Sequence, residues 1–280
     1  MIVSYHPLFD ADKNIICAGR DPNAEDLAAI RAADAVILPQ GCYRSLYEMV
    51  RKNCPQVFPN YDARFMYPGK INQIKLFRKL KVNHPESEIF PEIASYQKKY
   101  KAGRIKKSFK FPLVFKFDWG GEGETVYLID SAEDLHSTLK KAAEYENSGQ
   151  TGFILQKYIP SNSRILRVVI VGRRVISYWR IQENRDNFHS NLAKGAIIDS
   201  QSRPDLQQTG IALIENLCQN TGINLAGFDV IFSSENDHSD PMLLEINYFF
   251  GRKGLGGSEN YYRMLLKEIR AWLVSRNLVV

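Results

Sequence analysis

The pattern of apolar and polar positions differs between the first 60 residues and the rest of the chain. In the first 60 residues, short β-prone runs alternate with stretches of helical periodicity. Strands are predicted at 2–5, 35–38 and 56–58, with helices near 23–33 and 43–52. Strands that alternate with helices in this way are typical of a parallel sheet. We therefore predict an N-terminal α/β domain over residues 1–68.

A connecting segment is expected between this domain and the rest of the chain, over residues 69–110. Periodicity predicts a helix over 70–81. Residues 97–110 hold seven basic residues and no acidic one. We interpret that run as a solvated linker or helix face. Steering of phosphate or of an acidic partner is the alternative.

Longer strands with helices between them fill the remaining sequence. Strands are predicted at 111–117, 124–129, 153–159 and 166–171. A capping pair, Ser131 and Asp134, predicts a helix that ends near Asn147. Further helices are expected at 204–222 and after residue 258. We expect one small lobe over 111–160 and a second lobe over 161–280.

A hairpin near the C-terminus carries the most informative polar positions. Its two apolar strands flank a turn-forming segment and lie at 225–232 and 242–247. Because side chains alternate along a strand, Glu245 and Asn247 should share one face. Leu244 and Ile246 should then face a core, and Asp229 should join the polar pair across the ladder. Clustered oxygen donors of this kind suit Mg²⁺ or Mn²⁺. A solvated hairpin with outward polar residues explains the pattern equally well.

Composition narrows the class of protein. The 280 residues are 44% hydrophobic, enough for two or three lobes with real cores. No apolar run approaches the ~20 residues that span a bilayer, so a cytoplasmic protein is expected. Four widely spaced cysteines without a C-x-x-C pair argue against a zinc site and against disulfides, so we expect buried, reduced thiols. A net charge of +6 fits an anionic ligand such as a nucleotide, and weak nucleic-acid binding equally.

Three further features indicate phosphate binding. Lys116 lies in an otherwise apolar strand, where an ammonium is costly unless it meets an anion. Gly120, Gly121 and Gly123 then form a turn whose amides can fold over phosphates. Arg167, again within an apolar strand, can grip a phosphoryl oxygen at two points. For the first two features taken alone a structural explanation stays open: a lysine that snorkels to the surface, and an ordinary hairpin turn.

Taken in order, these pieces resemble the ATP-grasp superfamily, most closely the RimK-like and glutathione-synthetase-like carboxylate–amine ligases. The resemblance extends from about residue 70 to the C-terminus. It implies an α/β protein with an ATP-grasp fold of two α+β lobes, behind an N-terminal Rossmann-like pre-ATP-grasp domain. The matching residues are Lys70, Lys116, the glycines of 120–123, the hinge 156–159, the strand 166–172, the segment 188–195, Asp229 and the 244–247 strand.

By this resemblance, the site would bind ATP and Mg²⁺ (or Mn²⁺), with two ions expected. Lys70 and Lys116 would bind phosphates, the glycine turn would close over them, and Asp229, Glu245 and Asn247 would be the metal ligands. The remaining expected contacts fall into three sets. The hinge Gln156, Lys157, Tyr158 and Ile159 would bind adenine, chiefly through the backbone of Lys157 and Ile159. Arg167 and Asn191 would be catalytic, and Lys194 would add a cofactor contact.

The implied reaction converts a carboxylate into an acyl phosphate, which an amine then attacks, with release of ADP and phosphate. The expected partners are a small-molecule or peptide carboxylate and an amine acceptor; we expect neither nucleic acid nor membrane, and homo-oligomerisation stays open. Two alternatives also stay open: a nucleotide-binding protein without catalysis, and a ligase that modifies a protein tail or the ribosome.

Two departures from the family pattern concern the nucleotide end of the site. Lys157 stands where a carboxylate is usual, and Ile165 where an acidic residue often precedes the arginine. A third departure, the longer segment 248–257, is expected to shape the acceptor pocket. There Arg252 and Lys253 would pair with a substrate carboxylate, or else belong to a solvated loop.

Overall fold

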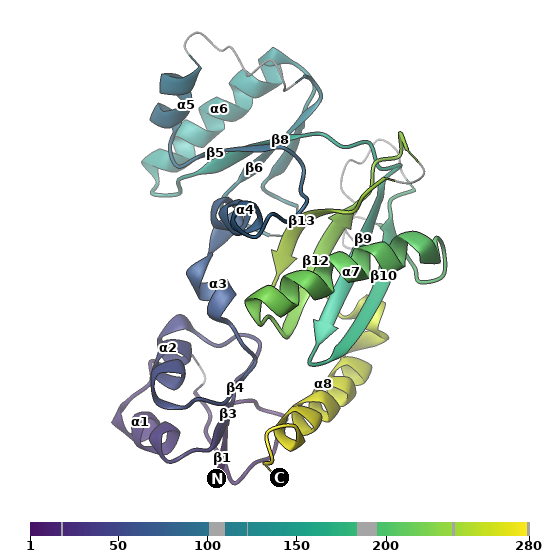
Figure 1. Ribbon diagram of the computed structural model, residues 1–280. Helices are drawn as coiled ribbons and strands as arrows, with labels where there is room; N and C mark the ends of the chain where they lie inside the picture. Colours follow the sequence, from purple (N-terminus) through teal and green to yellow (C-terminus); the bar gives the residue numbers. More distant parts are fainter. Residues whose placement is uncertain (18, 101–109, 122, 184–194, 237–238, 279–280) are drawn as a thin grey trace.

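The computed structural model describes residues 1–280 except 18, 101–109, 122, 184–194, 237–238 and 279–280. The described residues form three sheets, one in an N-terminal domain, one in a small lobe and one in a large lobe (Figure 1). This mixed α/β architecture is the predicted fold class.

The N-terminal domain is built on a parallel sheet, as the alternation of strands and helices predicts. Its strands are ordered β2-β1-β3-β4, and all pairs run parallel. The elements are β1 (Ile2–Ser4), β2 (Lys13–Asn14), α1 (Ala24–Arg31), β3 (Ala35–Ile37), α2 (Arg44–Asn53) and β4 (Val57–Phe58). A reciprocal capping box begins α1, because Asn23 and Asp26 each accept a hydrogen bond from the other's backbone N–H.

Two helices, α3 (Asp62–Met66) and α4 (Gly69–Lys79), connect the N-terminal domain to the small lobe (Figure 1). The apolar residues Ile71, Ile74 and Phe77 of α4 recur at helical spacing and are buried. The predicted helix over 70–81 is therefore confirmed, with its end two residues earlier.

The small lobe is an antiparallel sheet ordered β5-β8-β6-β7 and packed against two helices. Its elements are β5 (Ser87–Phe90), α5 (Ile93–Lys99), β6 (Leu113–Phe117), β7 (Val126–Ile129), α6 (Ala132–Asn147) and β8 (Phe153–Lys157). Phe115 stacks on Phe153 with ring centroids 4.7 Å apart. The expectation that 69–110 is wholly a helical connection was wrong, because β5 pairs with β8 and belongs to this sheet.

The large lobe is a five-stranded antiparallel sheet ordered β11-β10-β9-β12-β13. Its elements are β9 (Arg164–Val171), β10 (Arg174–Ile181), β11 (Ile197–Asp199), α7 (Pro204–Thr221), β12 (Leu225–Ile231), β13 (Met242–Asn247), the 3₁₀ turn η3 (Lys253–Leu255) and α8 (Gly257–Val274). Helix α7 covers one face, where Ile214 and Leu217 join the core formed by Val168 and Phe228. Helix α8 covers part of the other face, so only the remaining part is free for chemistry.

Helix α8 also joins the large lobe to the N-terminal domain. Residues of β1, β3 and β4 share one core with α8 and with Val169 and Val171 of β9. Phe58 packs on Trp272 at 5.6 Å between ring centroids, and the Asn60 N–H donates to Asn224 Oδ1 at 2.8 Å. The strand β1, at the N-terminus, and the C-terminal end of α8 lie near one another at this junction (Figure 1).

The cysteine prediction was correct about bonding and partly correct about burial. All four thiols are free; Cys42 and Cys54 are buried, while Cys17 and Cys218 are half-buried. Within the described parts of the chain, none of the helices combines the length and the apolar character needed to cross a bilayer.

The large-lobe core provides a stability test. Phe228 is fully buried, whereas Phe249 is 61% exposed. Phe228→Ala should lower the free energy of unfolding by about 3–5 kcal/mol, because it leaves a cavity in the sheet core. Phe249→Ala, the matched control, should change it little. Urea unfolding of both variants checks this, and equal transition midpoints would contradict the assigned core.

Candidate functional site

A row of charged side chains crosses the free face of the large-lobe sheet. In the observed register Asp229 of β12 lies opposite Arg167 of β9 on one side and opposite Glu245 of β13 on the other. Residues directly opposite on antiparallel strands point to the same face. The sheet therefore brings together three residues that are far apart in the sequence, as predicted.

A β-bulge sets the positions of the polar residues on β13. The register shifts between Asp229 and Val230, which pair with Glu245 and Leu243, so Leu244 is the extra residue. Leu243 is fully buried and Ile246 is 3% exposed, whereas Leu244 is only partly buried. The prediction that Leu244 faces the core was wrong, because simple alternation assumes an uninterrupted ladder. The placement of Ile246 in the core is confirmed.

Asp229 is the centre of a buried ionic network. Its Oδ1 accepts hydrogen bonds from Arg167 Nε at 2.7 Å and from Arg180 Nη2 at 2.5 Å. Its Oδ2 accepts from Arg167 Nη2 at 3.2 Å and from Asn247 Nδ2 at 3.1 Å. Burial by itself would raise the pKa of Asp229, but the two guanidinium groups outweigh it and lower the pKa to about 2. The carboxylate is therefore ionised throughout the neutral range.

Arg180 is a site residue that the sequence reasoning missed. It lies on β10, a strand that was not predicted, and its buried Nε has no hydrogen-bond partner among the described residues. Burial lowers the pKa of its guanidinium, and the charge of Asp229 acts in the opposite direction. A sequence signal existed: Gly172 and Arg173 form a two-residue connection after β9, and the following residues are β-prone.

Gly227 makes room for the paired arginine. A Cβ atom at this position would lie 3.1 Å from Arg167 Nη1 and 3.1 Å from Phe250 Cβ. The absence of a side chain therefore lets the Arg167 guanidinium lie close to the sheet.

Lys116, on β6 of the small lobe, interacts electrostatically with this network. Burial lowers the pKa of its ammonium to about 8; the charge of Lys70 acts in the same direction, and those of Glu245 and Asp229 oppose it. These four groups are thus close enough to influence one another. Lys70, on α4, is buried and donates to the backbone carbonyls of Gly120 at 2.9 Å and Trp119 at 3.3 Å.

The glycine turn follows Lys116 and has the backbone of a tight turn. Gly120 and Gly123 have φ values of +80° and +75°, which favour glycine. A Cβ on Gly120 would also lie 2.4 Å from Thr125 Cγ2, whereas nothing lies within 4 Å of one on Gly121. The turn is therefore tight on one side and open on the other, where backbone amides can approach an anion.

The predicted adenine hinge begins in β8 and continues beyond its end. Gln156 is buried, and its Nε2 donates to Ser87 Oγ at 2.9 Å. The Lys157 N–H donates to the Glu86 carbonyl at 2.8 Å and is thus already used by the protein. Tyr158 lines a polar cavity of about 920 Å³ together with Arg164 and other residues of the large lobe. Ile159 follows the strand and is partly buried.

Asn191 and Lys194 lie outside the described residues.

The donors suit a hard cation, but Asp229 is not free to bind one in this conformation. Its two oxygens accept four hydrogen bonds, and no group of three His, Cys, Asp or Glu side chains that could hold a metal occurs in the described part of the chain. Glu245 and the amide oxygen of Asn247 remain as donors. Two protein oxygens fit Mg²⁺, which usually keeps waters and phosphate oxygens as further ligands. Asp229 would join them only if an arginine released it.

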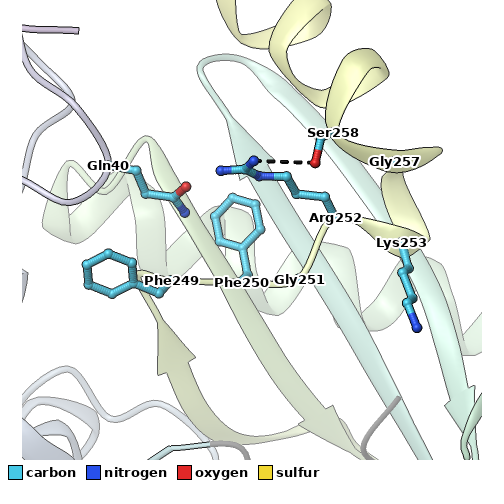
Figure 2. Close-up of a pocket in the computed structure, with 8 residues that line it drawn as sticks. All are labelled: Gln40, Phe249, Phe250, Gly251, Arg252, Lys253, Gly257 and Ser258. Atoms are coloured by element: carbon cyan, nitrogen blue, oxygen red, sulfur yellow. Dashed lines mark hydrogen bonds between the residues drawn. The ribbon is translucent and has the colours of Figure 1, made fainter. Parts of the chain in front are cut away.

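A second cavity, of about 360 Å³, lies between the N-terminal domain and the large lobe. Figure 2 shows Gln40, Phe250 and Arg252 turned toward one another, while Lys253 extends in another direction. The Arg252 guanidinium lies over the rings of Tyr261 and Tyr262, at 4.8 and 4.4 Å from their centroids. It donates to Ser258 Oγ at 3.4 Å, and none of the described carboxylates forms a salt bridge with it. Of the two basic residues that line the cavity, Arg252 is thus held over aromatic rings, whereas Lys253 extends away.

Comparison with known proteins places this geometry in a family. A model of the RimK-like ATP-grasp domain matches residues 68–265, well over half of the chain. Among curated relatives, an uncharacterised protein of Mycoplasma pneumoniae, the MG012 homolog, is 31% identical over 47% of this chain and 42% of its own length. A probable alpha-L-glutamate ligase of Aeromonas salmonicida is 25% identical over 51% of this chain and 45% of its own length. The chain thus spans less than half the length of either relative.

A solved structure gives the same fold. The ADP complex of an N5-carboxyaminoimidazole ribonucleotide synthetase superposes with a TM-score of 0.64 at 14% identity, covering 99% of this chain and 70% of the other. At this identity the likeness shows the fold alone.

The low pKa of Lys116 leads to a stability prediction. A folded-state pKa of about 8, below the ordinary 10.5, means that the charged lysine destabilises the fold at neutral pH. Lys116→Met should therefore raise the free energy of unfolding near pH 7, by up to about 3 kcal/mol at about 1.4 kcal/mol per pKa unit. The wild type should gain stability as the pH rises from 8 to 10.5, because the unfolded chain then holds more protons.

Chemical denaturation across this pH range measures the difference between the two proteins. The difference in the free energy of unfolding between Lys116→Met and the wild type should become smaller toward pH 10.5. The exposed Lys75→Met is the control for loss of a lysine charge as such. A gap that is constant with pH would show that burial of the Lys116 ammonium costs nothing.

Proposed function

Because the chain belongs to the RimK-like ATP-grasp family, we propose that it is an ATP-dependent carboxylate–amine ligase that works through an acyl phosphate. The charge balance of the site is the observation that carries this proposal. Four cationic side chains, Lys70, Lys116, Arg167 and Arg180, face two carboxylates, Asp229 and Glu245. An excess of positive charge in a buried site is costly unless an anion is bound. The polyphosphate of ATP supplies such an anion.

In this proposal the two lobes hold the nucleotide from opposite sides. Lys116 and the open side of the glycine turn contact the phosphates from the small lobe. Lys70 orders that turn through the carbonyls of Trp119 and Gly120, and its charge adds to the same field. The hinge at 156–159 receives the adenine. Divalent cations, when bound by Glu245 and Asn247, neutralise phosphate charge and align the terminal phosphorus for in-line attack.

Arg167 and Arg180 then act on the group that is transferred. Both guanidinium groups are oriented by one carboxylate, Asp229, so little reorganisation is needed when charge develops on the phosphoryl oxygens. The Nε of Arg180 has no hydrogen-bond partner among the described residues, so it is a donor that a substrate oxygen can use. The substrate carboxylate attacks the terminal phosphorus, ADP leaves, and the amine displaces phosphate from the acyl phosphate.

The cavity at Arg252 is proposed as the binding site for a substrate. Its guanidinium is held by two tyrosine rings and faces no described carboxylate, so it can pair with a substrate carboxylate at two points. His6 does not compete as a cation, because burial, with the nearby charge of Arg252, lowers its pKa to about 4. The aromatic lining favours a substrate that carries apolar groups beside its charge.

The non-catalytic alternative has less support. A protein that only senses a nucleotide has no use for two arginines aligned on one carboxylate beside the expected metal donors. Modification of a macromolecular acceptor would need a docking surface such as the basic run at 97–110, most of which lies outside the described residues.

The reaction class is directly testable. With Mg²⁺, ATP and a panel of carboxylates and amines, the protein should release ADP and orthophosphate only when a suitable carboxylate is present. Hydroxylamine in place of the amine should trap the acyl phosphate as a hydroxamate. Glu245→Gln should remove this activity while the fold, followed by circular dichroism, persists. Stoichiometric AMP and pyrophosphate would instead indicate adenylation and overturn the mechanism.

The assigned substrate pocket has its own test. Arg252→Met should raise the KM for the carboxylate found in that screen by about tenfold to a hundredfold, the usual effect of losing a charged hydrogen bond, with a smaller change in kcat. Lys253→Met is the matched control, because that ammonium extends in another direction (Figure 2). Equal KM values for the two variants would remove Arg252 from the substrate site.

A further inference from the structure

Gln73, on α4, makes an unusual two-point contact with the strand that carries Glu245 and Asn247. Its Nε2 donates to the carbonyl of Ile246 at 2.9 Å, and its Oε1 accepts from the N–H of Ile246 at 2.8 Å. Both bonds are buried, and Gln73 itself is 9% exposed. One side-chain amide thus satisfies both backbone groups of a single residue that lies 173 positions away.

The Gln73 side chain pairs with backbone groups of β13 that a neighbouring strand would otherwise pair with. β13 is the edge of the large-lobe sheet, so the backbone groups on its outer side have no neighbouring strand to pair with. The strand is also weakened nearby, because the bulge at Leu244 interrupts the ladder with β12. The primary amide of Gln73 has the donor and acceptor of a peptide group and completes the edge at Ile246.

The position of Ile246 gives this contact a consequence for the site. The Ile246 N–H belongs to the peptide unit shared with Glu245, and its carbonyl to the unit shared with Asn247. Since each peptide unit is planar, fixing both units fixes the directions in which the two neighbouring side chains leave the strand. The side chain of Ile246 points into the core, so Glu245 and Asn247 point to the opposite, catalytic face.

Helix α4 connects the same contact to the small lobe. Lys70 precedes Gln73 by three residues, so the two side chains leave neighbouring positions on one helix surface. Lys70 holds the carbonyls of Trp119 and Gly120 in the glycine turn. The helix therefore joins the turn expected over the phosphates to the strand expected to hold the cation.

We propose that Gln73 is a positioning residue for the cation site. It acts through the backbone of Ile246 and sets the spacing of Glu245 and Asn247. The inference rests on the proposed function, because only there are these two residues metal ligands. Gln73 touches neither the cation nor the phosphates, and its effect is on how well the donors are preorganised.

The test compares two buried glutamines. Gln207, on α7, is 7% exposed and its Nε2 donates to the carbonyls of Ser200 and Ser202, far from the expected cation donors. Gln73→Met and Gln207→Met each remove buried hydrogen bonds, so both should lower the melting temperature. Mn²⁺ binding in the presence of saturating ADP is then titrated by electron paramagnetic resonance, below the melting temperature of each variant.

Gln73→Met should weaken Mn²⁺ binding by about tenfold or more, as loss of a group that orients metal ligands does, while Gln207→Met should bind as the wild type does. Gln73→Glu keeps the acceptor for the Ile246 N–H and should lie between Gln73→Met and the wild type; it serves as the main variant if Gln73→Met does not fold. Wild-type Mn²⁺ affinity in the Gln73 variants, or equal loss in Gln207→Met, would overturn the positioning role. Glu245→Gln separates the two proposals: unchanged Mn²⁺ affinity there would reject the metal site itself.

Discussion

The buried contact of Asp229 with Arg167 and Arg180 is the interaction on which the rest of the site depends. Three strands, β9, β10 and β12, each contribute one of these residues, so the network exists only in the correct register of the large-lobe sheet. A one-residue slip in any pair would move a charge to the α7 face and into an apolar core. The two guanidinium groups keep the carboxylate ionised, and the carboxylate in turn holds both guanidinium groups in place.

The charges of the network are also unbalanced, and the proposed function rests on this imbalance. One carboxylate cannot neutralise two guanidinium groups, and Lys116 adds a charge from the other lobe at the cost of a lowered pKa. Proteins that bind polyphosphates accept this instability in the empty state, because the ligand removes it on binding. The same reasoning explains why Lys116 is a poor residue for stability and a suitable one for a phosphate.

Around this network, the structure divides the roles among its parts. The large lobe presents the arginines and the proposed cation donors, the small lobe presents Lys116 and the glycine turn, and α4 connects the two through Lys70 and Gln73. The N-terminal domain takes part by placing Gln40 beside the cavity at Arg252, where the Gln40 Nε2 donates to the Tyr248 carbonyl at 2.9 Å. Residues of two domains thus line the proposed substrate pocket, while the proposed nucleotide site lies between two lobes.

Local pattern by itself determined much of this protein. Helical and strand periodicity predicted the parallel N-terminal sheet, the hairpin of β12 and β13, and helices α4, α6, α7 and α8, because each buries one regular apolar face. The isolated charges within apolar runs, Lys116, Arg167 and Asp229, marked the site, since a charge in such a run needs a partner. Only the tertiary structure decided which partner each one has.

Arg180 and Gln73 show why the sequence was insufficient. Arg180 joins the site through the pairing of β10 with β9, for which the short connection at Gly172 is the local signal in the sequence. Gln73 joins through a contact across 173 positions, which leaves no periodic trace in the chain. The bulge at Leu244 likewise depends on how β13 meets β12, so alternation counted along one strand assigned the wrong leucine to the core. Periodicity reports which face of an element is buried, whereas the packing of distant elements determines what that face meets.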